Sequence, residues 1–293
     1  MQVFVAVADT AGFAPAARKL QMSPPAVTRA IAALEEHLGI LLFHRTTRQV
    51  RLTAAGARFL EDCRRILADL GEAEDSATGA HREPRGRLSI TASMRFGYMY
   101  VAPLLLEFLE RYPEVSVQTL FVDRVVNLLE EGLDVAVRIG PLPDSSLTAI
   151  RVGTVRRVVC GSPAYLARHG IPQISEALAD HDIVVFSALS PRPAWNFRTT
   201  DGELNVPLTS RLIVNTADVA IAAAVAGRGL TRVLSYMIAP ELKSGHLQIV
   251  LADYEPAPLP IHIVYQEGRK AAARVRAFVD FIVERLRADD SIG

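Results

Sequence analysis

The sequence predicts a small helical head, one long connecting helix and a larger body in which strands and helices alternate. Three observations predict this division. A helix with well-defined ends spans residues 23–39 and follows a short helix and a turn. Apolar residues recur at three- and four-residue steps between residues 53 and 78, as in one long amphipathic helix. From residue 88 onward, short apolar runs alternate with helical patterns, which is typical of an α/β domain.

The helix at residues 23–39 has a signal at each end. Ser23 is a good N-cap because its hydroxyl can accept a hydrogen bond from a backbone N–H of the first turn. Pro24 follows at the first helical position, where no N–H is needed, and Gly39 comes directly after the last apolar residue. The expected buried stripe consists of Val27, Ile31, Leu34 and Leu38. The opposite face consists of Pro25, Thr28, Arg29 and Ala32. A face this small and polar can approach a base-pair edge, although an ordinary surface helix would show the same pattern.

The segments on both sides of this helix decide between the two interpretations. Residues 3–20 predict two shorter helices separated at Gly12, and residues 21–22 form the turn into the helix at 23–39. Helix, short turn and helix is the arrangement that places a second helix in the DNA major groove. Segment 40–52 then mixes apolar residues, cations and neutral donors, which predicts a two-stranded wing whose tip reaches phosphates or the minor groove. A basic loop by itself is usually solvated surface, so the wing is predicted from the helix-turn-helix before it.

The candidate DNA contacts come from both segments. They are Ser23, Pro25, Thr28 and Arg29 in the helix, and Arg45, Thr46, Arg48 and Arg51 in the wing. Charge supports this placement modestly. Residues 1–65 hold nine Lys/Arg and five Asp/Glu, a net of +4, whereas the remainder holds 23 and 27, a net of −4. A basic head on an acidic body suggests that the head meets an anionic polymer.

Three consecutive segments carry a resemblance to a known family. They are F-V-A-V-A-D-T-A-G-F-A-P-A-A-R-K-L, then M-S-P-P-A-V-T-R-A-I-A-A-L-E-E-H-L-G, then L-L-F-H-R-T-T-R-Q-V-R-L-T-A-A-G. In their order and spacing the chain resembles the LysR-type transcriptional regulators, a bacterial family, most specifically over residues 2–60 and more loosely beyond. The resemblance implies a fold of the α+α/β class. It consists of an N-terminal winged helix-turn-helix at 1–52, a long linker helix and hinge at 53–87, and a C-terminal two-lobed α/β periplasmic-binding-protein-like domain at 88–293.

The long helix predicts self-association. Thr53 can cap it, and its seam is expected to consist of Leu60, Cys63, Leu67 and Leu70. Such a helix cannot bury its whole stripe against a 50-residue head, so a partner helix is implied. The resemblance makes that partner the twin helix of a second subunit, and further suggests tetramers built through body-to-body contacts. Residues 79–87, rich in glycine, proline and charge, are expected to form a hinge.

The body predicts two α/β units. In the first, strands at 88–93, 115–122 and 133–139 alternate with helices at 98–112 and 124–132, which implies a mostly parallel sheet with helices on both faces. Segments 147–152 and 156–160 lead into a second unit. The last strand, 261–266, and the terminal helix, 270–287, are expected to return to the first. We place lobe I at about 88–161 and 267–293, and lobe II at about 162–266.

Ligands of open α/β sheets lie beyond the carboxyl ends of strands, and hydroxyls and free N–H groups at helix starts favour anions. The candidate effector-binding residues at such ends are Ser93, Arg95, Phe96, Arg138, Asn215 and Thr216. Each also has an ordinary interpretation, as an N-cap, a surface cation or a core residue. Asp123 and Asp218 fall near the same ends and could instead favour a cation or a zwitterion. The resemblance implies a small-molecule effector, whose identity stays open, and no cofactor.

Other classes of protein fit the sequence less well. A solute-binding protein would need an export signal, but the N-terminus lacks a basic n-region and is interrupted by Asp9. An enzyme is not indicated, because the seven histidines show no metal-binding spacing and no nucleophile elbow, phosphate loop or dinucleotide fingerprint occurs. The two cysteines, Cys63 and Cys160, form no disulfide framework. We therefore expect a cytoplasmic homo-oligomer without catalytic or metal-binding residues. Its expected partners are double-stranded promoter DNA, a small-molecule effector and, as a candidate, RNA polymerase.

Overall fold

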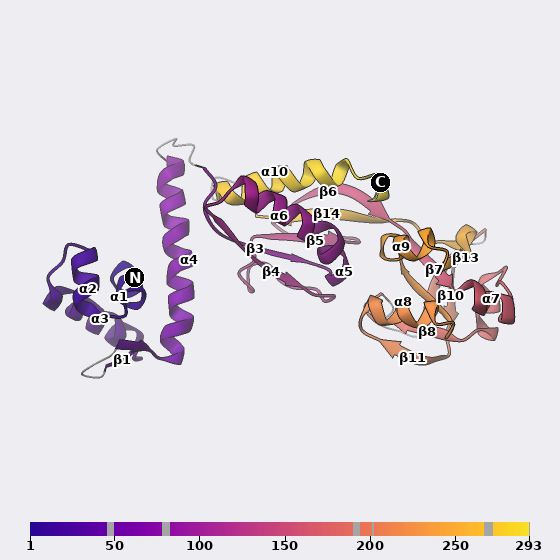
Figure 1. The fold of residues 1–293 in the computed structure, drawn as a ribbon, viewed down its shortest axis with the longest axis horizontal. Helices are drawn as coiled ribbons and strands as arrows, with labels where there is room; N and C mark the ends of the chain where they lie inside the picture. Colours follow the sequence, from indigo (N-terminus) through magenta and orange to yellow (C-terminus); the bar gives the residue numbers. More distant parts are fainter. Residues whose placement is uncertain (46–49, 78–82, 190–193, 201, 267–271, 293) are drawn as a thin grey trace. The chain divides into compact units, whose positions relative to one another are not determined.

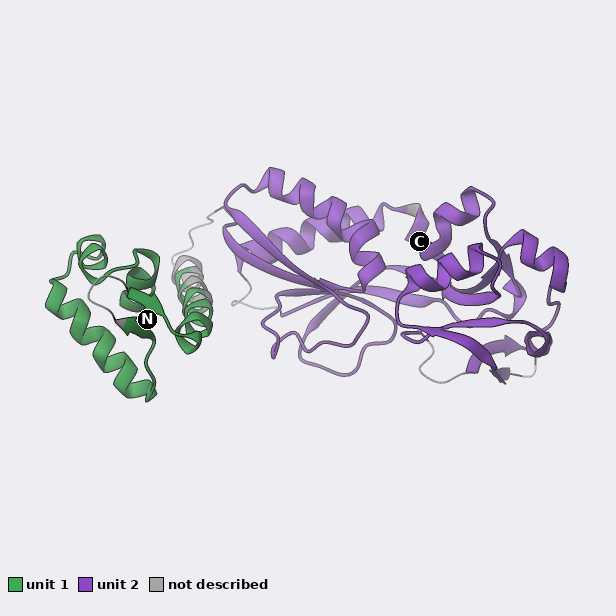
Figure 2. Cartoon of the chain, turned by 60° about the horizontal axis from the view of Figure 1, so that its bottom comes forward, with its two compact units in different colours: residues 1–82 green, residues 83–293 purple. Residues whose placement is uncertain are grey.

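The computed structural model describes residues 1–45, 50–77, 83–189, 194–200, 202–266 and 272–292. The chain divides into two compact units, residues 1–82 and residues 83–293, coloured separately in Figure 2. Each unit has its own hydrophobic core. Wing residues 46–49 and hinge residues 79–82 lie outside the described residues, and so does the expected helix start at residue 270.

The first unit contains the predicted helix-turn-helix and wing. Its elements are α1 (Gln2–Asp9), α2 (Phe13–Lys19), α3 (Pro24–Leu38), β1 (Phe43–Arg45), β2 (Val50–Leu52) and α4 (Ala54–Ala77). β1 and β2 pair antiparallel, as expected for a two-stranded wing. Phe4 of α1 lies at the centre of the core, with ring centroids 5.2 Å from Phe43 and 5.4 Å from Phe59. Aromatic contacts of this kind fix α1, the wing and α4 against one another.

α4 packs closely on the wing at its first turn. Thr53 caps the helix, because its hydroxyl accepts the N–H of Gly56 at 2.9 Å. A Cβ at Gly56 would lie 2.1 Å from the carbonyl oxygen of Leu42, so only glycine permits this approach. The sequence predicted the cap but not the reason for the glycine.

The second unit contains two five-stranded sheets. The sheet of lobe I has the order β4-β3-β5-β14-β6, and that of lobe II has the order β11-β8-β12-β7-β13. Lobe I consists of β3 (Gly86–Ala92), β4 (Val115–Phe121), β5 (Val135–Ile139), β6 (Thr148–Val155) and β14 (Leu259–Tyr265). Lobe II consists of β7 (Arg157–Gly161), β8 (Ile183–Phe186), β11 (Ser210–Val214), β12 (Leu230–Leu234) and β13 (Gln248–Val250), with a separate hairpin of β9 (Ala194–Thr199) and β10 (Gly202–Pro207).

The helices of this unit cover the sheets and join them. In lobe I they are α5 (Met94–Phe96), a π-helical turn η1 (Gly97–Val101), α6 (Ala102–Arg111), α10 (Ala273–Arg287) and η5 (Asp290–Ile292). In lobe II they are α7 (Pro163–His169), η2 (Ser175–Asp180), α8 (Ala217–Val225), η3 (Ser235–Ile238), α9 (Ala239–Lys243) and η4 (Ala252–Tyr254). Figure 1 shows α6 and α10 on the same face of the first sheet. Four details of this body differ from the prediction.

The sheets are mixed rather than mostly parallel. β3 pairs parallel with β4 and β5, whereas β14 pairs antiparallel with β5 and β6. The antiparallel strands are those reached by the two connections that cross between lobes. Such crossings reverse the direction of the chain, and the strand patterns do not reveal them. Helices also cover only one face of the first sheet, because residues 128, 133, 142 and 147 pack on the other.

Residues 124–132, all described, form turns rather than the expected helix. The side chain of Asn127 accepts the N–H of Leu129 at 3.1 Å, a local bond that competes with helix formation. The buried apolar residues of this segment, Val126 and Leu128, are two positions apart, whereas Val125 is 90% exposed and Leu129 is 60% exposed, so they do not form a helical stripe.

The lobe boundaries differ from those expected, although the return of the last strand and helix to lobe I is confirmed. β14 belongs to the sheet of lobe I, so the return crossing precedes residue 259 instead of following residue 266. β7 belongs to lobe II, so the first crossing falls at Arg156. The two crossings are joined there, because Nη1 of Arg156 lies 3.0 Å from the carboxylate of Glu255.

Candidate nucleic-acid interface and interlobe site

Helix α3 has the ends that the sequence predicted. The Ser23 hydroxyl accepts the N–H of Ala26 at 3.4 Å, and Gly39 ends the helix in the left-handed region at φ 67°. Val27 and Ile31 are buried, and Leu34 and Leu38 are half-buried. On the other face, the four residues proposed to meet DNA are all exposed: Ser23, Pro25, Thr28 and Arg29.

The wing brings two cationic positions side by side. His44 and Arg51 are direct partners in the antiparallel ladder, and both are exposed. Arg45 ends β1 opposite Val50. The two remaining wing candidates, Thr46 and Arg48, lie outside the described residues.

Glu35 is a residue that sequence reasoning missed. It lies on α3 but is only 6% exposed. One carboxylate oxygen accepts the backbone N–H groups of Leu42 at 2.8 Å and Phe43 at 3.1 Å. It therefore fixes the start of the wing relative to α3. An acidic residue inside an apolar stripe was the only available signal.

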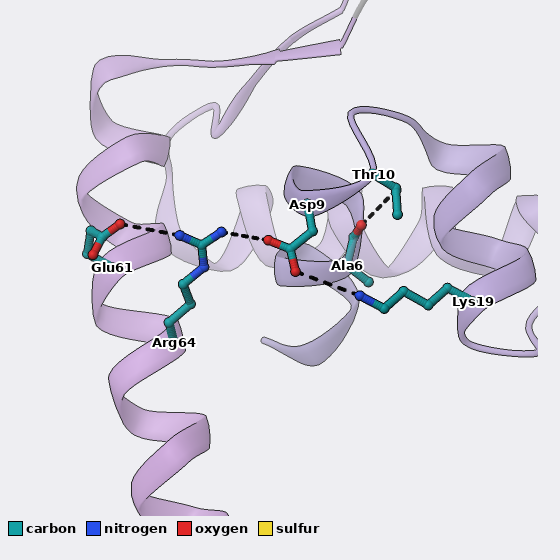
Figure 3. Close-up of polar contacts among 6 residues, drawn as sticks. All are labelled: Ala6, Asp9, Thr10, Lys19, Glu61 and Arg64. Carbon is teal, nitrogen blue, oxygen red and sulfur yellow. Dashed lines mark hydrogen bonds and ion pairs between the residues drawn. The ribbon is translucent and has the colours of Figure 1, made fainter. Parts of the chain in front are cut away.

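An ion-pair network joins three helices of the head (Figure 3). The carboxylate of Asp9, at the end of α1, lies 2.6 Å from the guanidinium of Arg64 on α4 and 3.8 Å from the ammonium of Lys19 on α2. Arg64 also meets Glu61 at 3.4 Å. Networks of this kind are more effective than isolated surface pairs.

The seam predicted on α4 is wrong in its first half. Leu60 is 7% exposed and Cys63 is fully buried, and both belong to the core of the head. α1 covers this part of the helix, so neither residue is available to a partner subunit. Further along, Leu67 is half-buried, Leu70 is 49% exposed and Ile66 is 43% exposed. A partner can reach only this second half, so the roles of Leu67 and Leu70 stay predictions.

Arg95 joins the two lobes of the body. It lies on α5 of lobe I, and its guanidinium makes ion pairs with Asp218 on α8 and, at 3.6 Å, with Glu241 on α9. Its Nε donates to the carbonyl oxygen of Met237 at 2.9 Å. The sequence suggested that Arg95 was a donor for an anion. The structure corrects this, because three groups of lobe II already occupy the guanidinium.

Several polar atoms near Arg95 have no hydrogen-bond partner among the described residues. The hydroxyls of Ser93 and Tyr236 and one carboxylate oxygen of Glu241 are buried without a hydrogen bond among the described residues. Tyr236 is 1% exposed, and burial raises the pKa of its phenol. The Ser93 hydroxyl is near enough to oppose that shift, although the two oxygens do not meet in hydrogen-bonding geometry. Buried polar groups usually have partners, so these atoms mark a candidate ligand site.

Asp123 lies at the end of β4, beside Ser93. Its carboxylate accepts the N–H of Met94 at 2.9 Å. Burial raises the pKa of Asp123, and the charge of Asp218 raises it further. We call Ser93, Asp123, Asp218, Tyr236 and Glu241, together with Arg95, the interlobe site.

The other predicted effector residues have different positions. Phe96 is fully buried, with its ring stacked 4.8 Å from Tyr100 and edge-on at 5.3 Å to Tyr236, so it is a core residue rather than an exposed wall. Arg138 donates to the carbonyl oxygen of Val126 at 2.6 Å, and burial lowers its pKa.

Thr216 is the N-cap residue of α8 and is half-buried, whereas Asn215 before it is exposed. They precede the helix that carries Asp218. The structure therefore brings Ser93 together with Asp218 and Tyr236 across the lobes, but it does not bring Arg138 into that group.

Family models match nearly the whole chain. A bacterial regulatory helix-turn-helix model of the lysR family matches residues 1–57, and a LysR substrate binding domain model matches residues 81–287. The chain belongs to the LysR family of transcriptional regulators. Among curated relatives, the HTH-type transcriptional regulator DmlR of Escherichia coli K12 is 34% identical over 283 residues, covering 96% of this chain and 92% of the relative. CrgA of Neisseria meningitidis serogroup B is 32% identical over 287 residues, covering 98% and 96%.

Solved structures agree in fold. CrgA from Neisseria meningitidis, described as a LysR-type transcriptional regulator, is 33% identical with a TM-score of 0.63 and 97% of each chain covered. The full-length virulence activator AphB of Vibrio cholerae is 28% identical with a TM-score of 0.64, covering 96% of this chain and 97% of that one. This LysR-type regulator thus combines a DNA-binding helix-turn-helix head with a two-lobed effector domain, and effector-responsive regulation is typical of its family.

The described residues show neither a membrane span nor a metal cluster. Among them, no helix is both long and apolar enough to cross a bilayer. The same residues contain no group of three or more His, Cys, Asp or Glu side chains placed to hold a metal ion.

Proposed function

We propose that this LysR-type regulator binds promoter DNA with the exposed face of α3 in the major groove and the wing on the backbone. Ser23, Pro25, Thr28 and Arg29 contact base edges or the nearest phosphates, and Arg45, Thr46, Arg48 and Arg51 hold phosphates. The observation that carries this proposal is that Ser23, Pro25, Thr28 and Arg29 are exposed on one face of α3, whereas Val27 and Ile31 on the reverse face are buried in the core of the head. A helix presented in this way suits direct contact with bases.

The effector binds between the lobes, in the interlobe site. Support comes from the three buried polar atoms without partners, contributed by both lobes. A ligand that completes those hydrogen bonds would favour one arrangement of the lobes. It can shift the assembly only by its differential affinity for the two arrangements. The shift is transmitted through residues 79–87 to the heads.

The protein acts as a homo-oligomer, through the second half of α4 and through body-to-body contacts. Apolar side chains exposed on lobe I include Tyr98 and Leu106, and on lobe II Ile213 and Val219. Exposed apolar residues on both lobes fit an interface between copies. The protein is cytoplasmic, uses no cofactor and performs no catalysis, and RNA polymerase is a candidate partner.

A selection of genomic fragments by the purified full-length chain tests this function. We expect enrichment of fragments with a roughly two-fold symmetric site, and loss of that enrichment when Thr28 and Arg29 are both replaced by alanine. Equal recovery of all fragments by the wild-type chain would contradict a sequence-specific regulator. Addition of an effector to the same selection should then alter occupancy or spacing at the enriched sites.

A further inference from the structure

The charges of the interlobe site are mostly negative. Asp218 and Glu241 both face Arg95, and Asp123, just after the end of β4, accepts the N–H of Met94 next to Arg95 and feels the charge of Asp218. Asp123 makes no ion pair within the part of the chain that the structure describes, and the neighbouring charge that perturbs it is another carboxylate. A half-buried carboxylate next to a like charge is costly, so a bound cation would stabilise it.

The one cation of this group is already engaged. Arg95 has a side chain 16% exposed, and its donors face Asp218, Glu241 and the carbonyl oxygen of Met237. Two carboxylates already balance the charge of Arg95, so an organic anion bound beside it would add a further negative charge to the group. Arg138, the other cation predicted for the site, donates to Val126 instead.

The polar atoms without partners suit a donor-rich ligand. The orphan oxygen of Glu241 can only accept hydrogen bonds, whereas the hydroxyls of Ser93 and Tyr236 can donate or accept. Tyr236 is 1% exposed, so its unpaired hydroxyl is buried in the protein rather than in contact with bulk water. Its neighbours include Asp123 and Arg95.

Aromatic rings pack beside this group. The rings of Phe96, Tyr100 and Tyr236 lie 4.8–5.7 Å apart, with two from lobe I and one from lobe II. They belong to the core, so the sign of the ligand follows from the carboxylates, which outnumber the one cation of the group.

We infer that the interlobe site takes a ligand with a protonated amine, held by Asp123 and Glu241, whose remaining polar group meets the hydroxyls of Ser93 and Tyr236. This inference rests on the proposed function, which places the effector between the lobes. Simple organic acids are then poor effectors of this regulator, and amines or zwitterions are good ones.

Matched ligand series test the sign of the charge. Calorimetry with the full-length chain at constant ionic strength would compare an amine, an alcohol and a carboxylic acid on each of the benzyl, phenethyl and butyl groups. In at least one series the amine should bind at millimolar concentration or below, and at least about tenfold more tightly than the acid. Failure of every amine to bind, or tighter binding of the acid in every series, overturns the inference.

Substitutions locate the binding. Asp123→Asn keeps an oxygen for the N–H of Met94 but removes the charge, so it should weaken binding of the amine about tenfold or more. Tyr236→Phe should weaken it about three- to tenfold. Asp280→Asn, an exposed aspartate of α10 in the same lobe, is the matched control and should leave the affinity unchanged. Equal binding by Asp123→Asn and wild type overturns the inference.

The result also separates this inference from the function on which it rests. If acids bind and Ser93→Ala removes their binding, the interlobe site is the effector site and only the amine preference is wrong. If ligands bind and neither Ser93→Ala nor Asp123→Asn alters their affinity, the effector lies elsewhere and both ideas fail.

Discussion

We expect DNA recognition by α3 to depend most directly on Arg29. It is exposed beside Thr28, and no described side chain pairs with it. If it contacts a guanine edge, Arg29→Ala should cost on the order of 1–3 kcal/mol and relax the preference at one base pair. If it holds a phosphate, the affinity for all DNA sequences should fall alike, and the slope of log K against log salt concentration should become smaller by about one. A gel-shift series over several salt concentrations distinguishes these outcomes, and unchanged affinity for every sequence contradicts both.

We expect the two cysteines to be structural rather than redox-active. Cys160 is fully buried, and burial raises the pKa of its thiol to about 12. Burial also raises the pKa of Cys63. Since the thiolate is the reactive form, we expect native protein to react with iodoacetamide at pH 8 far more slowly than unfolded protein. Peptide mapping of the alkylated cysteines measures this. Rapid alkylation of Cys160 in the native protein would show that the region around this thiol opens to solvent.

The same shift predicts a pH dependence of stability. The folded state binds the Cys160 proton more tightly than the unfolded state, in which the thiol has its ordinary pKa of 9.0. This contribution is fully present below pH 9 and is lost as pH rises toward about 12. Urea denaturation of wild type and Cys160→Ala between pH 8 and pH 11 should therefore show a steeper decline for wild type. Parallel curves would mean that the thiol titrates normally.

Residues with a local signal were predicted well. Ser23, Gly39 and Thr53 act through neighbours in sequence, so their types and positions sufficed. Arg95 was misassigned because its partners come from lobe II, with Asp218 more than 120 residues away in the sequence, and Phe96 was misassigned in part because Tyr236 of lobe II packs on its ring. Nothing in the residues around position 95 indicates those partners.

At the scale of elements, Glu35 couples α3 to the wing. Glu35→Ala leaves the buried N–H groups of Leu42 and Phe43 without their acceptor, at about 1–3 kcal/mol each. We expect faster hydrogen exchange in residues 40–52 and weaker DNA binding, with little change in the body. Glu35→Gln retains an acceptor oxygen and should recover part of the loss. Equal exchange in Glu35→Ala and wild type would show that the wing is held by other contacts.

Elements with strong periodicity, such as α3 and α10, were predicted close to their observed bounds. The segment at 124–132 was not, because Asn127 forms a side-chain bond that periodicity does not include. On α4 the stripe was identified correctly, but its periodicity does not reveal which partner covers it. α1 covers Leu60 and Cys63, and the second half begins near Ile66.

At the scale of the whole molecule, assembly should depend on that second half of α4. Ile66 and Leu70, one helical turn apart, are 43% and 49% exposed, which is unusual for large apolar side chains on a helix. We expect the double change Ile66→Glu and Leu70→Glu to convert dimers to monomers at micromolar concentration, because two carboxylates would face their counterparts in a desolvated seam. Sedimentation velocity measures this directly.

Ala57→Glu is a matched control, since residue 57 is exposed on the opposite face of the same helix.

The consequence for DNA follows from linkage of the two heads. In a dimer the second half-site contact is intramolecular, so affinity for a two-half-site operator exceeds that for one half-site by about 10²- to 10⁴-fold. The double variant should lose most of this excess while its half-site affinity stays unchanged, because the contacts of α3 are untouched. If dimers persist in the double variant, the assembly contact lies in the body. If the affinities for the operator and for the half-site fall together, the substitutions have damaged the head instead.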